Sequence, residues 1–340
     1  MKKLLLMLLC LLLPLCALAD GHGGIGIPKD YAEYLKMMQD SQYDTVSIRQ
    51  GFVWPTEEVT LNWTGEKWIE IVGGMTIPEN VTVNCSQMIA VSAGKGDMMI
   101  NGVWNCLSDT GVIYSSLGNV IYNGPVTFTC DKRVRLSNSD TNFIFNGPMH
   151  INALVNAQDL TLGDGVVIDG EKSLQFDGTL SVPEGSVSIG VQLEPTRGNE
   201  DQPATIAGEM VIKELFVSKN SPCLIAAGSC VTVESLAVQE EGTLRIDGTV
   251  ELAESTRHMG MRGTIALGDA GELILQQKVR LGNNLGGKIT GTGTLRLNAR
   301  VREDGSIQGG IPSIFNVSTY EKLPEEYVET TVKIVRNWKE

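Results

Sequence analysis

A three-residue unit recurs at almost constant spacing between residues 100 and 170. Each copy is an apolar residue followed by Asn or Asp and then Gly: Ile100-Asn101-Gly102, Tyr122-Asn123-Gly124, Phe145-Asn146-Gly147 and Ile168-Asp169-Gly170. A fixed period of roughly 22 residues is typical of a solenoid, in which each coil buries its apolar face on the next. The repeat therefore predicts a stack of similar coils.

The Asn and Asp of this unit are interpreted as structural residues. They are expected to occupy the same corner of successive coils: Asn101, Asn123, Asn146 and Asp169. At such a corner their side chains can hydrogen-bond the neighbouring coil, and the following Gly is expected to supply a positive φ. The alternative is a row of polar groups that lines a binding face.

Between the corners, short runs alternate apolar and polar residues, as Val81–Cys85 and Val126–Cys130 do. Alternation with period two predicts strands with one buried face. Aligning these runs places three cysteines in one inward-facing column: Cys85, Cys106 and Cys130. In an exported chain such cysteines can form disulfides. A pair within the column and a pair between Cys223 and Cys230 both remain open.

The chain ends suggest caps on the solenoid. A helix is expected at Asp30–Gln39, followed by a strand that begins at Asp44-Thr45-Val46. Together with coils of about 20–24 residues, this pattern resembles right-handed parallel β-helix proteins, the pectin-lyase-like superfamily. The resemblance implies an all-β fold: a single-stranded, right-handed parallel β-helix with a short N-terminal capping helix. Because that superfamily includes lyases, glycoside hydrolases, tailspikes and adhesins, the fold alone selects no function.

The 340 residues divide into four expected segments. Residues 1–19 have Lys2 and Lys3, an apolar run and a small-x-small cleavage site before Asp20, which is typical of a cleaved signal peptide. Residues 20–75 are predicted as a leader and cap, 76–311 as coils and 312–340 as a C-terminal cap. Within the coils, residues 194–204 and 257–262 are predicted as inserted loops.

The signal peptide predicts a secreted, periplasmic or cell-surface protein, and its short Met-Lys-Lys start is typical of bacteria. A formal net charge of −13 disfavours binding to nucleic acid or anionic membranes. No later stretch is long and apolar enough to span a membrane. We expect the partner to be a glycan or a host or cell-surface protein.

No complete catalytic constellation is present, so a surface or adhesin-like binding or structural module is the leading hypothesis. A polysaccharide lyase or glycoside hydrolase is the alternative. Its candidate residues are three carboxylates and two cations: Asp164, Asp169, Asp177, Lys132 and Arg133. Two carboxyl groups roughly 5–10 Å apart would serve hydrolysis. The resemblance implies bound Ca²⁺ beside an Arg or Lys base for a lyase, and no cofactor is expected otherwise.

Four of the five tryptophans lie in the first third of the chain: Trp54, Trp63, Trp68 and Trp104. If exposed, they would provide stacking surfaces for sugars or an anchor for a protein. If buried, they would pack the cap against the first coils. We favour the second interpretation, and the four residues remain the ligand-binding candidates.

Signal cleavage before Asp20 predicts a metal site at the new N-terminus. The free amine, two amide nitrogens and the His22 imidazole can bind Cu²⁺ or Ni²⁺ in a square plane, and Asp20-Gly21-His22 resembles the amino-terminal motif of serum albumins. We expect the mature protein to develop the absorption band of a four-nitrogen Cu²⁺ complex on titration. The idea fails if no band appears, or if His22→Ala leaves the band unchanged.

Overall fold

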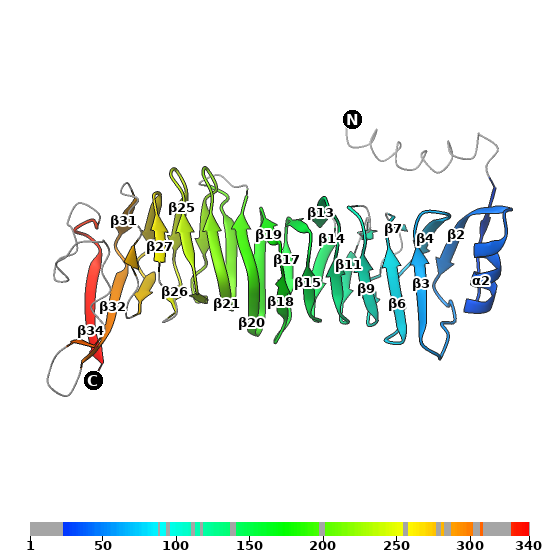
Figure 1. Ribbon diagram of the computed structural model, residues 1–340, viewed down its shortest axis with the longest axis horizontal. Coiled ribbons are helices and arrows are strands. Elements are labelled where there is room, and N and C mark those ends of the chain that lie inside the picture. Colours follow the sequence, from blue (N-terminus) through cyan, green and yellow to red (C-terminus); the bar gives the residue numbers. More distant parts are fainter. Residues whose placement is uncertain are drawn as a thin grey trace.

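The computed structural model describes residues 23–87, 89–92, 96–109, 113–115, 118–136, 141–196, 201–253, 258–276, 280–281, 287–301, 307–308 and 328–339. They form an elongated parallel β-solenoid of about 11 turns, with 60% strand and 4% helix (Figure 1). Helix α2 (Tyr31–Gln39) lies at one end and β34 (Lys333–Lys339) at the other. The predicted all-β parallel β-helix is confirmed.

In the first half of the solenoid, the strands of each coil fall into three rows along the axis. The first row contains β5 (Met75–Ile77), β8 (Met98–Ile100), β11 (Gly118–Tyr122), β14 (Thr141–Phe145) and β17 (Leu160–Leu162). The second row contains β3 (Val59–Trp63), β6 (Val81–Cys85), β9 (Val103–Cys106), β12 (Val126–Phe128), β15 (Met149–Ile151) and β18 (Val167–Gly170).

The third row begins as a separate five-stranded sheet: β1 (Gly24–Gly26), β2 (Tyr43–Arg49), β4 (Trp68–Val72), β7 (Ile89–Ser92) and β10 (Ile113–Ser115). The same part of later coils is formed by β13 (Arg133–Leu136), β16 (Leu154–Ala157) and β19 (Ser173–Phe176). Two long strands, β20 (Thr179–Pro195) and β21 (Ala204–Val217), then pass through all three rows and pair with each other.

The second half repeats the arrangement. It contains β22 (Cys223–Ile225), β23 (Cys230–Val233), β24 (Leu236–Val238), β25 (Thr243–Ile246), β26 (Thr249–Leu252), β27 (His258–Met261), β28 (Thr264–Leu267), β29 (Glu272–Leu275), β30 (Arg280–Leu281), β31 (Lys288–Gly291), β32 (Thr294–Val301) and β33 (Ile307–Gln308). The final strand, β34, pairs in parallel with β32 and so adds a further rung to the sheet.

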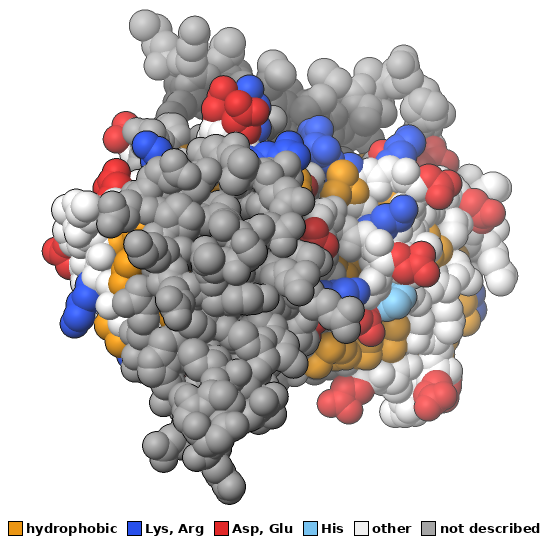
Figure 2. All heavy atoms as spheres, turned by 60° about the vertical axis from the view of Figure 1, so that its left-hand side comes forward, with side chains coloured by type: hydrophobic (Ala, Val, Ile, Leu, Met, Phe, Trp, Pro, Cys, Tyr) orange, Lys and Arg blue, Asp and Glu red, His pale blue; other side chains and the backbone are white. Residues whose placement is uncertain are grey.

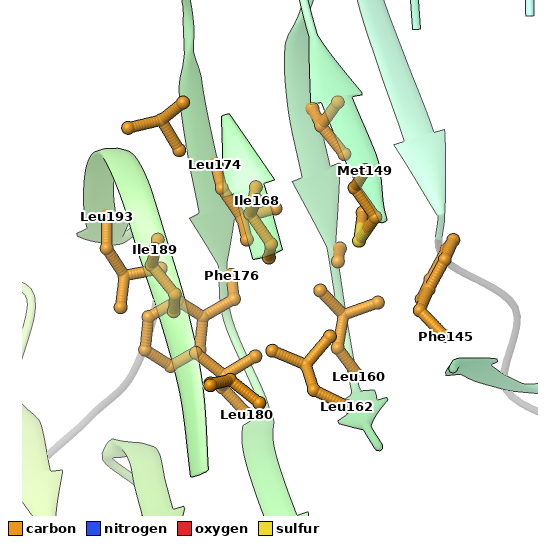
Figure 3. Close-up of a cluster of buried hydrophobic side chains, with 14 of the residues drawn as sticks. Phe145, Met149, Leu160, Leu162, Ile168, Leu174, Phe176, Leu180, Ile189 and Leu193 are labelled. Carbon is orange, nitrogen blue, oxygen red and sulfur yellow. The ribbon is translucent and has the colours of Figure 1, made fainter. Parts of the chain in front are cut away.

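Alternate residues of each strand point into the solenoid and form one continuous core. Figure 3 shows how inward side chains from successive strands meet, among them Phe145, Leu162 and Phe176. Burial of each such side chain stabilises the fold by about 1.5–3 kcal/mol. The first coils have an aromatic core, in which the Tyr122 and Phe145 rings stack with centroids 4.7 Å apart.

Helix α2 closes the first coil. The Asp30 carboxylate caps it by accepting a hydrogen bond from the Glu33 backbone N–H at 2.8 Å, as the predicted helix start requires. The hydroxyl of buried Tyr34 accepts a hydrogen bond from Trp63 Nε1 at 3.0 Å. Burial raises the pKa of Tyr34 to about 12. Because β3 already pairs with β6, the coils begin before residue 76, within the segment expected to be the cap.

The expected amide ladder is present at the Asn-Gly corners. Asn123 Nδ2 donates to Asn101 Oδ1 at 2.7 Å, and Asn146 Nδ2 donates to Asn123 Oδ1 at 2.8 Å. The expected positive φ is present at Gly170, at 129°, but not at Gly102, Gly124 or Gly147, so the glycines of the ladder have another reason. A Cβ on Gly124 would lie 2.0 Å from the Gly102 carbonyl oxygen, so Gly is required by the close approach of neighbouring coils.

Asp169 does not continue this ladder, which corrects the sequence interpretation. The coil after Asn146 is shorter, so Phe145 pairs with Leu162 and the next corner residue is Gly163. A Cβ on Gly163 would lie 2.5 Å from Asn146 Oδ1, and the ladder ends there. Asp169 instead pairs in register with His150 in the second row. The sequence unit recurs at Asp169 with nearly the same spacing, but the corner that follows Asn146 in the next coil is Gly163.

The cysteine column is also shorter than expected. Cys85 and Cys106 pair in register, but Phe128 is the residue that faces Cys106 in the next coil. Cys130 lies beyond Phe128, after the end of β12. Its thiol still donates to the carbonyl of the second residue after it, at 3.1 Å, as the Cys85 and Cys106 thiols do at 3.0 and 3.1 Å.

Of the two predicted insertions, one is a loop and one is a strand. β20 ends at Pro195 and β21 begins at Ala204, so the described residues 196 and 201–203 lie between strands, as predicted. Residues 194, 195 and 204 belong to the strands themselves, and 197–200 lie outside the described part. Residues 258–261 instead form strand β27, in which Met259 and Met261 are buried. Met259 and Met261 alternate with His258 and Gly260, which is typical of a strand. The polar residues on either side, Arg257 and Arg262, led to the loop prediction.

We predict that Gly124→Ala destabilises the fold by about 1–3 kcal/mol, because its Cβ would overlap backbone of the preceding coil. Gly260→Ala is the matched control, since a Cβ there meets only the Ala237 Cβ at 3.6 Å and Cα at 3.8 Å. Thermal and urea unfolding of both variants measure the difference. Equal unfolding midpoints for the two variants would contradict the close-approach explanation.

Candidate functional site

A second asparagine ladder runs along the outer face of the second row. Asn84 Nδ2 donates to Asn62 Oδ1 at 2.8 Å, and Asn105 Nδ2 donates to Asn84 Oδ1 at 2.9 Å. A shorter ladder in the first row joins Asn142 Nδ2 to Asn119 Oδ1 at 2.9 Å. The N-terminal half of the solenoid therefore has three parallel asparagine ladders: one at the corner, one on the second row and one on the first row.

These ladders leave hydrogen-bonding capacity on the surface. A primary amide has two N–H donors and two acceptor positions on its oxygen. Asn84, in the middle of its ladder, uses one donor and one acceptor on its neighbours. One donor and one acceptor therefore remain. Parallel strands lie about 4.8 Å apart, so these groups recur at that interval along the axis.

Beyond Asn105 the same outer column continues with Thr127, His150 and Asp169. His150 Nδ1 lies 2.6 Å from Asp169 Oδ1, and its Nε2 lies 2.8 Å from Asn152 Nδ2. The His150 and Asp169 side chains are 46% and 66% exposed, so their pairing contributes at most about 1 kcal/mol. Because this coil is shorter than the sequence period, a search at that period missed the pair.

The structure separates the other enzyme candidates. Asp164 Oδ1 accepts a hydrogen bond from the Ser186 backbone N–H at 3.0 Å, which fixes a corner. Asp177 lies directly after β19, whereas Asp169 lies within β18. Lys132 Nζ lies 3.5 Å from Asp109 Oδ2, with both side chains open to solvent, and Arg133 is exposed at the start of β13.

The residues that a lyase would need for Ca²⁺ do not come together. Asp169 faces His150, whereas Asp164 contacts the backbone of the following coil. Within the described ranges, no three His, Cys, Asp or Glu side chains are arranged to hold a metal ion. The Cu²⁺ candidates Asp20, Gly21 and His22 lie outside the described residues.

The four tryptophans have different environments. Trp63 and Trp104 are fully buried, with ring centroids 5.8 Å apart, so neither can stack on a ligand. They are packing residues of the first coils, which is the interpretation favoured from the sequence. Trp68 is 43% exposed on β4. Trp54 is half-buried and lines a groove.

That groove lies beside the N-terminal end of the solenoid and has a volume of about 480 Å³. We call it the N-terminal groove, and it is lined by residues that include Arg49, Phe52, Trp54, Gly74, Gly96 and Asp97. A second groove, of about 350 Å³, lies at the end of β18, where Gly170 lines it. Its charged lining residues are Glu171, Lys172, Lys213 and Glu214.

The second groove arises where the outer column reaches a glycine. Gly190 lies against Asp169, since a Cβ on Gly190 would be 3.9 Å from the Asp169 Cα, and the pairing of β20 with β21 is irregular between Ile189 and Gln192. Gln192 Nε2 donates to Glu214 Oε1 at 2.8 Å on the neighbouring column. Two carboxylates and two lysines therefore surround one hollow, although none of them matches a sequence motif.

The remaining surface is mixed in charge. In the face that Figure 2 shows, acidic and basic side chains are scattered among uncharged ones. In the part of the chain that the structure describes, no helix is both long enough and apolar enough to cross a membrane. No family model, curated protein or solved structure matches this chain.

All five cysteines of the described chain are free thiols. Burial raises the pKa of Cys85, Cys106 and Cys223 to about 12, whereas Cys230 is exposed. Cys223 and Cys230 cannot form the disulfide considered from the sequence without rearrangement, since the first points into the core and the second to solvent.

We predict that iodoacetamide at pH 8 labels Cys130 and Cys230 in the folded protein and spares the three buried thiols. The thiolate is the reactive form, and a pKa of about 12 keeps these thiols protonated at pH 8. Mass spectrometry of digests identifies the labelled sites, and unfolding in urea should expose all five. Rapid native labelling of Cys85 or Cys106 would contradict the burial.

Proposed function

We propose that this chain is an exported β-helix protein that acts as a surface or adhesin-like binding and structural module, with a glycan as its partner. The observation that supports the proposal is the set of asparagine ladders in the N-terminal half of the solenoid. Each inner amide keeps one donor and one acceptor beyond its ladder bonds. Their recurrence at the strand spacing suits a partner that is itself a regular polymer of hydroxylated units.

This proposal places the protein outside the cytoplasm through the signal peptide expected at residues 1–19. A placement within the pectin-lyase-like superfamily is part of the same proposal, and it rests on the coil pattern. A scaffold of about 11 stacked turns is stiff and elongated, which is suited to holding a binding face away from an anchoring surface.

A carbohydrate-active enzyme, either a polysaccharide lyase or a glycoside hydrolase, is the second candidate. The second groove favours it, because Glu171 and Glu214 line the same hollow as Lys172 and Lys213. Carboxyl pairs support glycoside hydrolysis and a lysine can act as a lyase base. The His150–Asp169 pair lies beside this groove rather than within it.

The two candidates differ in what happens to a bound polysaccharide. We expect the mature protein to be retained by at least one member of a panel of immobilised neutral and acidic polysaccharides, with no release of shortened or unsaturated products. Chromatography of the supernatant measures release. Product release with turnover would replace the binding module with the enzyme, and the absence of any retention would reject glycan binding.

Variants then test the ladder. Asn84→Ala should weaken retention roughly two- to tenfold, as expected for one or two lost hydrogen bonds. Gln158→Ala is the control, because this exposed amide lies between β16 and β17 and belongs to none of the ladders. Thermal unfolding of both variants establishes that the coils remain intact. Equal retention by the two variants would show that the ladder does not contact the glycan.

A further inference from the structure

Glycines form part of the lining of the N-terminal groove. Gly74 and Gly96 lie at the corner between the third and first rows in successive coils. A Cβ on Gly96 would lie 2.8 Å from the Gly74 Cα, so the two backbones are in direct contact. Part of the groove lining is therefore backbone that carries no side chain.

One wall of the groove is aromatic and held in place. The Trp54 ring packs edge-on against Phe52, with centroids 4.8 Å apart and an interplanar angle of 78°. Both rings are partly buried against the core, yet both line the groove. A fixed indole with part of its surface open to a groove is suited to stacking on the C–H face of a sugar ring.

The polar rim combines a group that only donates with a group that only accepts. Arg49 is exposed and forms no ion pair with any described residue, so its guanidinium donors are available. Asp97 is also exposed, and its Oδ1 accepts a hydrogen bond from the Asn119 backbone N–H at 3.0 Å. The carboxylate keeps further acceptor positions. A hydroxyl can accept from Arg49 and donate to Asp97.

This pairing selects against charged ligands. A carboxylate in the groove would be attracted by Arg49 but repelled by the Asp97 carboxylate. A cation would be attracted by Asp97 but repelled by Arg49. An uncharged ligand with several hydroxyl groups satisfies both side chains. The volume of about 480 Å³ is within the range of small-ligand sites. The strand spacing of about 4.8 Å is also close to the length of one unit in a polysaccharide.

We propose that the N-terminal groove binds one neutral sugar unit of a polysaccharide, with its ring stacked on Trp54 and its hydroxyl groups bonded to Arg49 and Asp97. This inference rests on the proposed glycan-binding function and assigns it a site and a ligand class. The first-row ladder begins at Asn119, whose backbone N–H donates to Asp97, and it then contacts the units that follow along the axis.

The test titrates the whole mature protein with neutral oligosaccharides of glucose, galactose and mannose, and with a uronic acid oligosaccharide. Calorimetry measures affinity. The fluorescence change that the unaltered protein shows and Trp54→Ala lacks reports on Trp54, because Trp68 is also exposed. Trp54→Ala should lower affinity for the neutral ligand roughly tenfold. Trp68→Ala, which removes an exposed indole outside the groove, should leave affinity unchanged.

Two further variants separate binding from folding. Thr76→Trp places a large side chain in the groove, which Thr76 lines from β5, and it should abolish binding. Asp97→Asn removes the acidic charge and should improve binding of the uronic acid oligosaccharide relative to neutral ones. Circular dichroism and thermal unfolding check each variant.

The outcomes distinguish this inference from the proposed function. If the polysaccharide panel shows retention but Trp54→Ala and Thr76→Trp bind as the unaltered protein does, the groove is not the site and the function stands. If the unaltered protein prefers uronic acid oligosaccharides, the neutral-sugar assignment is wrong. If nothing in the panel is retained, both proposals fall.

Discussion

The solenoid depends on how closely one coil can approach the next at its corners. Strand hydrogen bonds set the separation at about 4.8 Å, and the corners must accept the same separation without a sheet to organise them. At Gly102, Gly124 and Gly147 the backbones are so close that no side chain fits between them. The adjacent Asn residues use their amides to join the coils at this distance. The close approach of the coils thus requires the Gly of the three-residue unit, and the hydrogen bond between coils requires its Asn.

The same constraint explains what the sequence could reveal. The fold was predictable because the corner unit repeats, and the helix at Asp30 was predictable from its cap and apolar spacing. Asp169 was misplaced because the unit recurs there by coincidence, whereas the coil between Phe145 and Leu162 is shorter. Cys130 was misplaced because matching Val126 to Val81 set the wrong register. Val126 pairs with Trp104, which pairs with Val83. Spacing and local similarity reveal register only where coil length is constant.

Prediction of the candidate site was more limited. Sequence could not separate buried Trp63 from groove-lining Trp54, because the exposure of an indole depends on which neighbouring coil covers it. The His150–Asp169 pair and the two grooves arise from residues in different coils. Whether these residues come together depends on the length of the coil between them. The residues next to each of them in the sequence do not indicate that length.

The asparagine ladders also have a direction. In all five bonds between asparagine side chains of the described residues, the later coil donates and the earlier coil accepts. The amide dipoles therefore add along the axis, and each bond polarises the next. Each ladder presents a spare donor at its first residue and a spare acceptor at its last. A polymer lying on this surface would meet a polar track, on which its two chain orientations are energetically distinct.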